Sequence, residues 1–469
     1  MLVIILNVKI WIAFQYKIGI VDGYTILLNA RRFYYGYDPF IAYTLSTPPL
    51  LPYMISLSWY LTGENIFVAE AIQPIFAVAG AWILCSLLRR MFNLKVGVIA
   101  ALFFLAMPEV FVGTNLIIVQ SVGSFLLASV AYLLWRGIKG EPEFYPLASG
   151  ALALATLVDY TNLVFAAALL LGIVAYRWDT VKAIIHSRMK IGEMRLPFWF
   201  PFAVIVFLAI WLPWIDWNAV NAGSAFASLQ AGLLSAQIST GTQGGFYIVN
   251  LLDLLGIGGL LFLLIGLVDR RNLIVKRRTL FLLWIAAYLI CYSALPNRQP
   301  IFYVEWSAPL AAFAALGVIR LEGKLPGRSK GLVWCLVIIW LGYTYMTAVN
   351  VSLYTSPLSL SNQYNGVKNY DEFNQVVNWV DSNTNHTTIG ATDMGPVLSY
   401  FSNRLFYDMS WLSQQSNSSS LSIIQFMRHV GVTLIVVRIT YISTTNLYNY
   451  AELILVRSFP DYLIFQLKP

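Results

Sequence analysis

Residues 19–50 read GIVDGYTILLNARRFYYGYDPFIAYTLSTPPL, and this polar, aromatic stretch separates two long apolar runs. It carries one acid close to its start, Asp22, and it closes on a pair of prolines. A connection that merely joins two helices needs only a few residues. We therefore interpret residues 19–65 as a first external loop that carries a candidate active site, and the rest of the sequence is read outward from it.

The composition indicates a membrane protein. Of the 469 residues, 58% are hydrophobic and 11% are charged, whereas soluble domains carry about 25% charged residues. The three cysteines all lie in apolar runs. They therefore predict neither a disulfide framework nor a cysteine metal site.

Eleven apolar stretches are candidates for membrane-spanning helices, each of which needs about 20 residues. Several are short on their own, and one long apolar run is interrupted by Asp159. Together they predict a mainly α-helical, polytopic membrane bundle over residues 1–349. The candidate spans lie at about 1–18, 66–88, 96–113, 116–135, 145–158, 161–176, 197–215, 247–268, 279–295, 301–319 and 331–349.

The basic residues predict an orientation for this bundle. With the N-terminus inside, the cytoplasmic connections hold most of the 30 Lys and Arg, and the external loops of the membrane part hold only Arg31, Arg32 and Arg298. Such an asymmetry follows the positive-inside rule. It accounts for the net charge of +8 without nucleic acid, so no nucleic-acid partner is predicted.

A change in composition indicates a second domain over residues 350–469. Asn, Ser, Thr and Tyr become frequent, and the long apolar runs end. Eleven spans place this part outside, as do three N-glycosylation sequons that start at Asn350, Asn385 and Asn417, because such sequons imply an exposed extracytoplasmic surface. Helical and strand patterns alternate along it, which predicts a small C-terminal α/β domain. Helices are expected at residues 372–383, 395–404 and 420–432, and strands at residues 387–392, 432–439 and 462–467.

A further external loop, residues 216–246, is rich in small residues. Long loops without their own pattern often carry function. We interpret this loop as a mobile flap or a re-entrant segment over a site.

Acids on the external side are the first candidates for chemistry. A charged side chain at membrane depth costs about 2.5–3.5 kcal/mol on insertion scales, so an acid there is a functional candidate by default. Asp22 fits best because it lies where the first helix meets the outer face, and Asp38, Glu109 and Asp159 are the next candidates. The structural alternative is that Asp22 caps the helix TILLNARRFYYG, whose dipole favours an anion at its N-terminus.

External cations are the candidates for binding phosphate. A guanidinium group suits phosphate because its planar fork donates two hydrogen bonds at once. Arg31 and Arg32 point about 100° apart on a helix, so one can face a donor phosphate while the other faces head groups; snorkelling to anionic lipid is the alternative. Arg298 lies at the lip of the tenth span. Tyrosines such as Tyr37 either form the interfacial aromatic belt or stack on a sugar ring.

The first loop resembles the first external loop of the GT-C glycosyltransferases, in particular the group of protein O-mannosyltransferases and lipid A aminoarabinose transferases. That group carries an Asp-Glu-x-x-Tyr…Ala-Arg…Gly…Pro-Tyr…Pro-Pro-Leu pattern. Further resemblances lie at residues 61–92, 157–161 and 394–401. The matching string is Asp22-Gly-Tyr24…Ala30-Arg31…Gly36-Tyr37-Asp38-Pro39-Phe40…Ser46-Thr47-Pro48-Pro49-Leu50.

This resemblance implies an activity. Such enzymes take a hexose or pentose from a polyprenyl-phosphate carrier on the extracytoplasmic face and pass it, with inversion, to a hydroxyl of a protein or glycolipid. The acid of the first loop, Asp22 in this chain, is implied as the general base, and cations stabilise the departing phosphate. The implied surroundings are the cell membrane and its lipids.

Three departures from the family pattern concern the acids. The second acid of the pattern falls on Gly23, another family acid falls on Gln120, and the Lys of Leu-Thr-Lys-Tyr falls on Asp159. These departures argue against a divalent metal held by two external acids, although Glu109 or Asp159 is an alternative partner. No cofactor is therefore assigned, and a divalent metal stays the less favoured alternative.

Two other classes of function compete with sugar transfer. Intramembrane Asp159 and broken helices also fit a transporter or flippase of a polyprenol-linked or other amphipathic substrate. A non-catalytic relative anchored by its membrane part is the third class. The long first loop and the external α/β domain favour the enzyme, because an alternating-access carrier needs neither.

Overall fold

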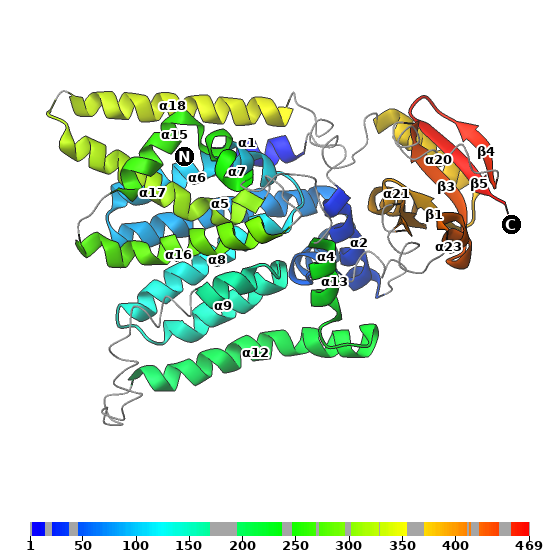
Figure 1. Ribbon diagram of the computed structural model, residues 1–469, viewed down its shortest axis with the longest axis horizontal. Coiled ribbons are helices and arrows are strands. Elements are labelled where there is room, and N and C mark those ends of the chain that lie inside the picture. The colour runs from blue at the N-terminus through cyan, green and yellow to red at the C-terminus, as the bar shows by residue number, and fades with distance from the viewer. Residues whose placement is uncertain are drawn as a thin grey trace. The chain divides into compact units, whose positions relative to one another are not determined.

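The computed structural model in Figure 1 describes most of the chain and shows a mainly helical protein with one sheet. The chain divides into two compact units. The first comprises Met1–Ala13, Pro48–Leu51 and Phe67–Tyr354, and the second comprises Phe14–Thr47, Pro52–Ile66 and Thr355–Pro469. The described residues are 2–14, 21–36, 46–168, 195–236, 246–268, 272–295, 302–327, 329–353, 370–409, 412–413, 422–439 and 452–468.

The first unit is built from helices, and five of its helices are long and apolar enough to cross a membrane. Five shorter apolar helices accompany them among the described residues. The number of spans and the orientation stay predictions. The helices are α1 (Leu2–Ala13), α5 (Ile66–Met91), α6 (Leu94–Ala106), α7 (Pro108–Gly113), α8 (Val119–Ile138), α9 (Phe144–Val158), α12 (Arg195–Ala222), α13 (Ala227–Ala236), α14 (Phe246–Val249), α15 (Leu251–Leu267), α16 (Asn272–Ala294), α17 (Tyr303–Lys324) and α18 (Ser329–Leu353).

Helix α17 is the central helix of this unit, since every residue from Tyr303 to Val318 is buried. It packs against α6, α8, α15, α16 and α18. Its approach to α15 is close because glycines meet there: a Cβ added at Gly266 would lie 2.0 Å from the Phe313 carbonyl oxygen, and one at Gly317 would lie 1.9 Å from the Phe262 carbonyl oxygen. Small residues let two backbones approach in this way.

Asp159 ends helix α9, as its position in the sequence predicts. Its backbone is extended, and its Oδ1 accepts hydrogen bonds from the backbone N–H of Thr161 at 2.9 Å and from the Thr161 hydroxyl at 2.7 Å. This Asx-type turn replaces the next helical turn. The indole N–H groups of Trp211 and Trp214 on α12 then donate to Thr156 and Tyr160, which fixes the turn to α12.

The predicted loop at residues 216–246 includes regular structure. Helix α12 continues to Ala222, and α13 follows at Ala227–Ala236. The residues 237–245 lie outside the described part of the chain. The interpretation of this loop as a flap stays a prediction.

The second unit combines segments of the first loop with the C-terminal α/β part. Its helices are α2 (Val21–Tyr35), α4 (Leu50–Thr62, in this unit from Pro52 on), α20 (Tyr370–Asn383), α21 (Gly395–Ser402) and α23 (Ile423–His429). Its five-stranded sheet has the order β2-β1-β3-β5-β4. The strands are β1 (Ile389–Thr392), β2 (Leu405–Asp408), β3 (Val432–Arg438), β4 (Leu453–Ser458) and β5 (Tyr462–Leu467).

Four strands of this sheet run in one direction, and β5 runs against them. Strand β1 pairs in parallel with β2 and β3, and β5 runs antiparallel to both β3 and β4. The helices predicted at α20, α21 and α23 and the strands predicted at β1, β3 and β5 are confirmed. A capping box of Ser422 and Gln425 starts α23, and it satisfies two backbone donors of that helix.

Candidate functional site

Helix α2 carries the first-loop residues, and its sequence explains its burial. The side chains of Tyr24, Leu27 and Leu28 are almost fully buried, which is the spacing of one helical face. The Tyr24 ring lies 5.4 Å from the ring of Tyr400 and 5.5 Å from that of Phe401, both on α21. The helix ends at Gly36, whose positive φ and N–H bond to the Arg32 carbonyl form a glycine C-terminal stop.

Arg31 connects three parts of the second unit. Its Nε donates to Glu64 Oε1 at 2.7 Å, and its Nη1 donates to the Tyr400 carbonyl oxygen at 2.8 Å. Its guanidinium also lies 3.9 Å from the centre of the Tyr400 ring. A planar guanidinium that donates in two directions and stacks on a ring is a combination that arginine provides and lysine does not. Tyr35 donates to the other carboxylate oxygen of Glu64 at 2.7 Å, and this hydrogen bond is the main cause that raises the pKa of Tyr35.

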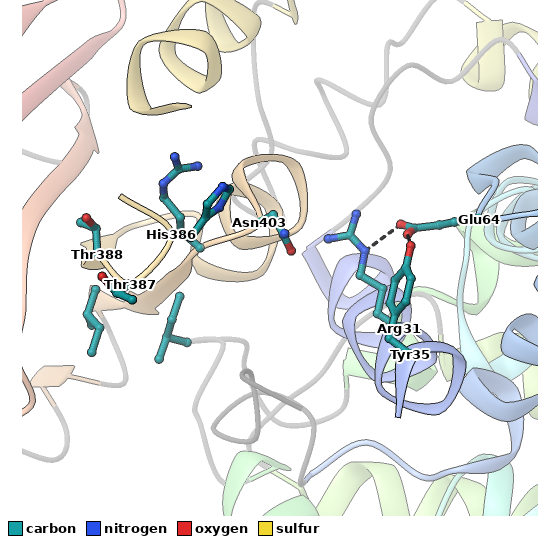
Figure 2. Close-up of a pocket in the computed structure, with 10 residues that line it drawn as sticks. Arg31, Tyr35, Glu64, His386, Thr387, Thr388 and Asn403 are labelled. Atoms are coloured by element: carbon teal, nitrogen blue, oxygen red, sulfur yellow. Dashed lines mark hydrogen bonds and ion pairs between the residues drawn. The ribbon is translucent and has the colours of Figure 1, made fainter. Parts of the chain in front are cut away.

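These residues line a cavity of about 820 Å³ in the second unit. Figure 2 shows Arg31, Tyr35 and Glu64 on one side and His386, Thr387 and Thr388 on the other. The volume lies within the range of small-molecule sites, about 300–1,000 Å³. The remaining lining residues are Ile389, Asn403, Arg404 and Leu405.

Arg404 forms part of the wall of this cavity. Its guanidinium is buried, pairs with the Asp381 carboxylate, and donates to the carbonyl oxygens of Thr384 at 2.9 Å and of Asn385 at 3.2 Å. Because one side chain satisfies several carbonyls of the segment after α20, that segment is held in place. Asn403, in a left-handed conformation, ends α21 beside it, as asparagine commonly does.

The cavity is suited to a polar ligand with both donors and acceptors. Its two arginines are each paired with a carboxylate, so it presents little net charge. His386, Thr387 and Tyr35 are exposed at its wall. Hydroxyl, imidazole and carboxylate groups beside an aromatic ring can bind a sugar or the polar part of an acceptor.

The first unit contains a separate polar cluster around two acids. Glu305, in the first turn of α17, is fully buried. Its Oε2 accepts a hydrogen bond from the Tyr292 hydroxyl, and its Oε1 accepts one from Asn162 Nδ2 at 3.3 Å. The Tyr292 oxygen lies 3.1 Å from the Thr161 hydroxyl oxygen, and Thr161 donates to Asp159. Tyr288 donates to the side-chain carbonyl of Asn162.

The predicted site residues have different outcomes. Asp22 is the second residue of α2, but its side chain is outside the described part. Tyr37, Asp38 and Arg298 also lie outside the described residues. Arg31 lines the cavity, and Arg32 is buried with its guanidinium 4.4 Å from the centre of the Phe33 ring.

The two remaining candidates belong to the first unit. Glu109 is in the first turn of α7, half-buried. Asp159 is linked to Glu305 through Thr161 and Tyr292. Within the described ranges, no group of three or more His, Cys, Asp or Glu side chains could hold a metal ion.

Two residues of these clusters were not predicted as site residues. Glu64 is one of the few acids of the first external loop, and that scarcity was its signal. Glu305 lies in the run YVEWSAPLAAF. An acid inside a candidate span is a functional candidate by default, so this signal was present as well.

Comparison with known proteins gives a family match and a fold. The sequence model described as dolichyl-phosphate-mannose-protein mannosyltransferase matches residues 46–217. No curated protein matches the sequence. The solved structure of ArnT from Cupriavidus metallidurans bound to undecaprenyl phosphate is similar, with a TM-score of 0.69 at 12% identity, and the similarity covers 99% of this chain and 97% of that one.

A second kind of solved structure is also similar. The Archaeoglobus fulgidus oligosaccharyltransferase in complex with zinc and sulfate has a TM-score of 0.60 at 16% identity, covering 93% of this chain and 67% of that one. Identities this low establish a shared fold. By the match over residues 46–217 and by this fold, the chain resembles the GT-C membrane glycosyltransferases, as its first external loop predicts.

Proposed function

We propose that this membrane protein is a glycosyltransferase that moves a sugar from a polyprenyl-phosphate donor to a hydroxyl of a protein or glycolipid on the extracytoplasmic face, with inversion. The observation that carries the proposal is the fold shared with ArnT bound to undecaprenyl phosphate over 99% of the chain. The family match over residues 46–217 supports the same activity. The orientation of the bundle and the external position of the C-terminal part belong to this proposal.

In this proposal Asp22 is the general base. It is the second residue of α2, where the dipole of the helix favours a negative charge, and a base must be ionised to accept a proton. The carboxylate takes the proton of the acceptor hydroxyl as that oxygen bonds to the anomeric carbon of the sugar. The bond from that carbon to the phosphate oxygen breaks at the same time, and the polyprenyl phosphate leaves with the electron pair.

Cations stabilise the negative charge of the leaving phosphate, and we assign that role to Arg298 together with Arg31 or Arg32. Arg31 also has the contacts with Glu64 and Tyr400 described above, so its first role is to position α2. Tyr37 and Asp38 follow Gly36, the residue after α2, and we assign them to the surroundings of the donor. The cavity of the second unit (Figure 2) is assigned to the polar part of the acceptor, because its lining combines donors, acceptors and an exposed aromatic ring.

The test is a transfer assay with the purified, detergent-solubilised protein. Radiolabelled polyprenyl-phosphate hexoses and pentoses are supplied one at a time with an extract of the cell envelope as acceptor. The proposal predicts that label moves from the lipid to a protein or glycolipid fraction with one donor and that free polyprenyl phosphate accumulates in equal amount. The same donors are then supplied to the protein reconstituted into vesicles, where label that crosses the membrane while still attached to its lipid would instead favour a flippase.

A further inference from the structure

Two acids and two hydroxyls of the first unit form a chain of four oxygen-bearing groups. From one end to the other it runs from Asp159 through Thr161 and Tyr292 to Glu305. Three contacts join these four groups: carboxylate to hydroxyl, hydroxyl to hydroxyl at 3.1 Å, and hydroxyl to carboxylate. Each contact needs one proton between its two oxygens if it is to be a hydrogen bond.

Counting protons determines the charge of this chain. Thr161 and Tyr292 contribute one hydroxyl proton each. If both acids were ionised, two protons would serve three contacts, and the oxygens of Thr161 and Tyr292 would face each other without one. If both acids were protonated, four protons would compete for three contacts. A chain with one protonated acid places one proton in every contact and leaves none over.

The surroundings favour the same count. Glu305 is fully buried and Asp159 is half-buried. Among the described residues, no Lys or Arg forms an ion pair with either acid. A buried carboxylate without a cation is costly, and two that are coupled through hydroxyls cost more. The titratable groups that face the acids are Tyr288, Cys291 and Tyr292, all on α16.

We propose that Asp159 and Glu305 form a proton-binding site that holds one shared proton inside the helix bundle. The proton resides on either acid. The protonated acid then donates to its neighbouring hydroxyl, the two hydroxyls donate onward to the ionised acid, and a concerted shift of the three chain protons reverses these directions. A metal cation in its place is disfavoured, because the Glu305 oxygens already accept hydrogen bonds from Asn162 and Tyr292. Through the hydrogen bonds of this chain, the bound proton links the segment that follows α9 to helices α16 and α17.

Infrared spectroscopy of the purified full-length protein near neutral pH tests the site, because a protonated carboxyl has its own carbonyl band that shifts in D₂O. Three variants are compared with the wild type: Asp159→Asn, Glu305→Gln and the double variant. In each single variant the amide N–H supplies the missing donor, so the remaining acid ionises. Glu322→Gln, on the same helix and hydrogen-bonded to Trp334, is the matched control.

The shared proton predicts a specific pattern. Each single variant loses the band of one carboxyl, and the double variant loses no more than either single variant. The control keeps the band. Two independently protonated acids would give an additive loss in the double variant, and two ionised acids would give no loss in any variant; either result overturns the proposal. The two single variants are measured separately. If one of them does not fold, the band of the other still shows whether the remaining acid has lost its proton.

Discussion

The Nε atom of Arg31 lies 2.7 Å from Oε1 of Glu64, and this ion pair joins α2 to the residue that follows α4 by two positions. Both side chains are mostly shielded from solvent, with 17% and 19% exposed. The same guanidinium is stacked on Tyr400 of α21. Through Arg31, the C-terminal half of α2 is therefore held by an ion pair with Glu64 and by a cation–π contact with Tyr400.

We expect Arg31→Lys to destabilise the protein by about 1–2 kcal/mol, because lysine retains the charge but loses the planar fork and the stacking. A double-mutant cycle with Glu64→Gln should give a coupling energy of about 1 kcal/mol. Thermal unfolding followed by circular dichroism measures both values. The control is Arg457→Lys, since Arg457 is exposed on β4; additive effects of the Arg31 and Glu64 variants would contradict a direct pair.

Gly266→Ala should destabilise the first unit by about 1–3 kcal/mol or more, as overpacking of a tight contact does. The new methyl group would meet the Phe313 carbonyl oxygen of α17 at 2.0 Å, and backbone cannot move aside as a flexible side chain can. Gly342→Ala on α18 is the matched control, because nothing lies within 4 Å of its Cβ position. The control should be neutral or gain up to about 1 kcal/mol from helix propensity. Equal unfolding temperatures for both variants would refute the close contact of α15 and α17.

The Tyr35–Glu64 hydrogen bond predicts an alkaline effect on stability. It raises the pKa of Tyr35 above its usual value, which is about 10, so the folded protein holds this proton more tightly than the unfolded chain. The stabilisation is therefore full below about pH 10 and is lost as the pH rises through the folded pKa. Tyr35→Phe should reduce the loss of stability in this alkaline range, measured as unfolding temperatures on both sides of it. Tyr343→Phe, on an exposed position of α18, is the control that should leave the profile unchanged.

Arg298→Ala should raise the Michaelis constant for the polyprenyl-phosphate donor more than that for the acceptor. The reason is that the proposed partner of this cation is the donor phosphate, and a charge-assisted hydrogen bond contributes about 1.5–3 kcal/mol. Steady-state kinetics with each substrate varied in turn measures the two constants. An unchanged donor constant would remove Arg298 from the phosphate site.

Local pattern sufficed to predict several elements. The helix expected over TILLNARRFYYG is present within α2, and the interruption of an apolar run at Asp159 predicts the end of α9. Strands β2 and β4 were missed, because β2 has only four residues and both lie at the edges of the sheet. Whether such short segments become strands depends on their neighbours more than on their own propensity.

The candidate site was harder to predict because its contacts are far apart in the sequence. The sequence predicts that Arg31 binds phosphate, yet its described partners are Glu64 and Tyr400, and Tyr400 lies 369 positions away. Glu305 lies within a predicted apolar span, and its link to Asp159 needs two hydroxyls from other segments. Charge and spacing identify residues that are unusual for their setting, but only the fold determines which of them meet.

The central claim is sugar transfer by the acid of the first loop, and single-turnover transfer from a radiolabelled polyprenyl-phosphate sugar by Asp22→Asn tests it most directly. General-base catalysis contributes about 10²–10⁴-fold, so we predict a rate constant lower by that factor, with donor binding unchanged. Asp371→Asn, in the first turn of α20, should transfer at the wild-type rate. Wild-type transfer by Asp22→Asn would contradict the account.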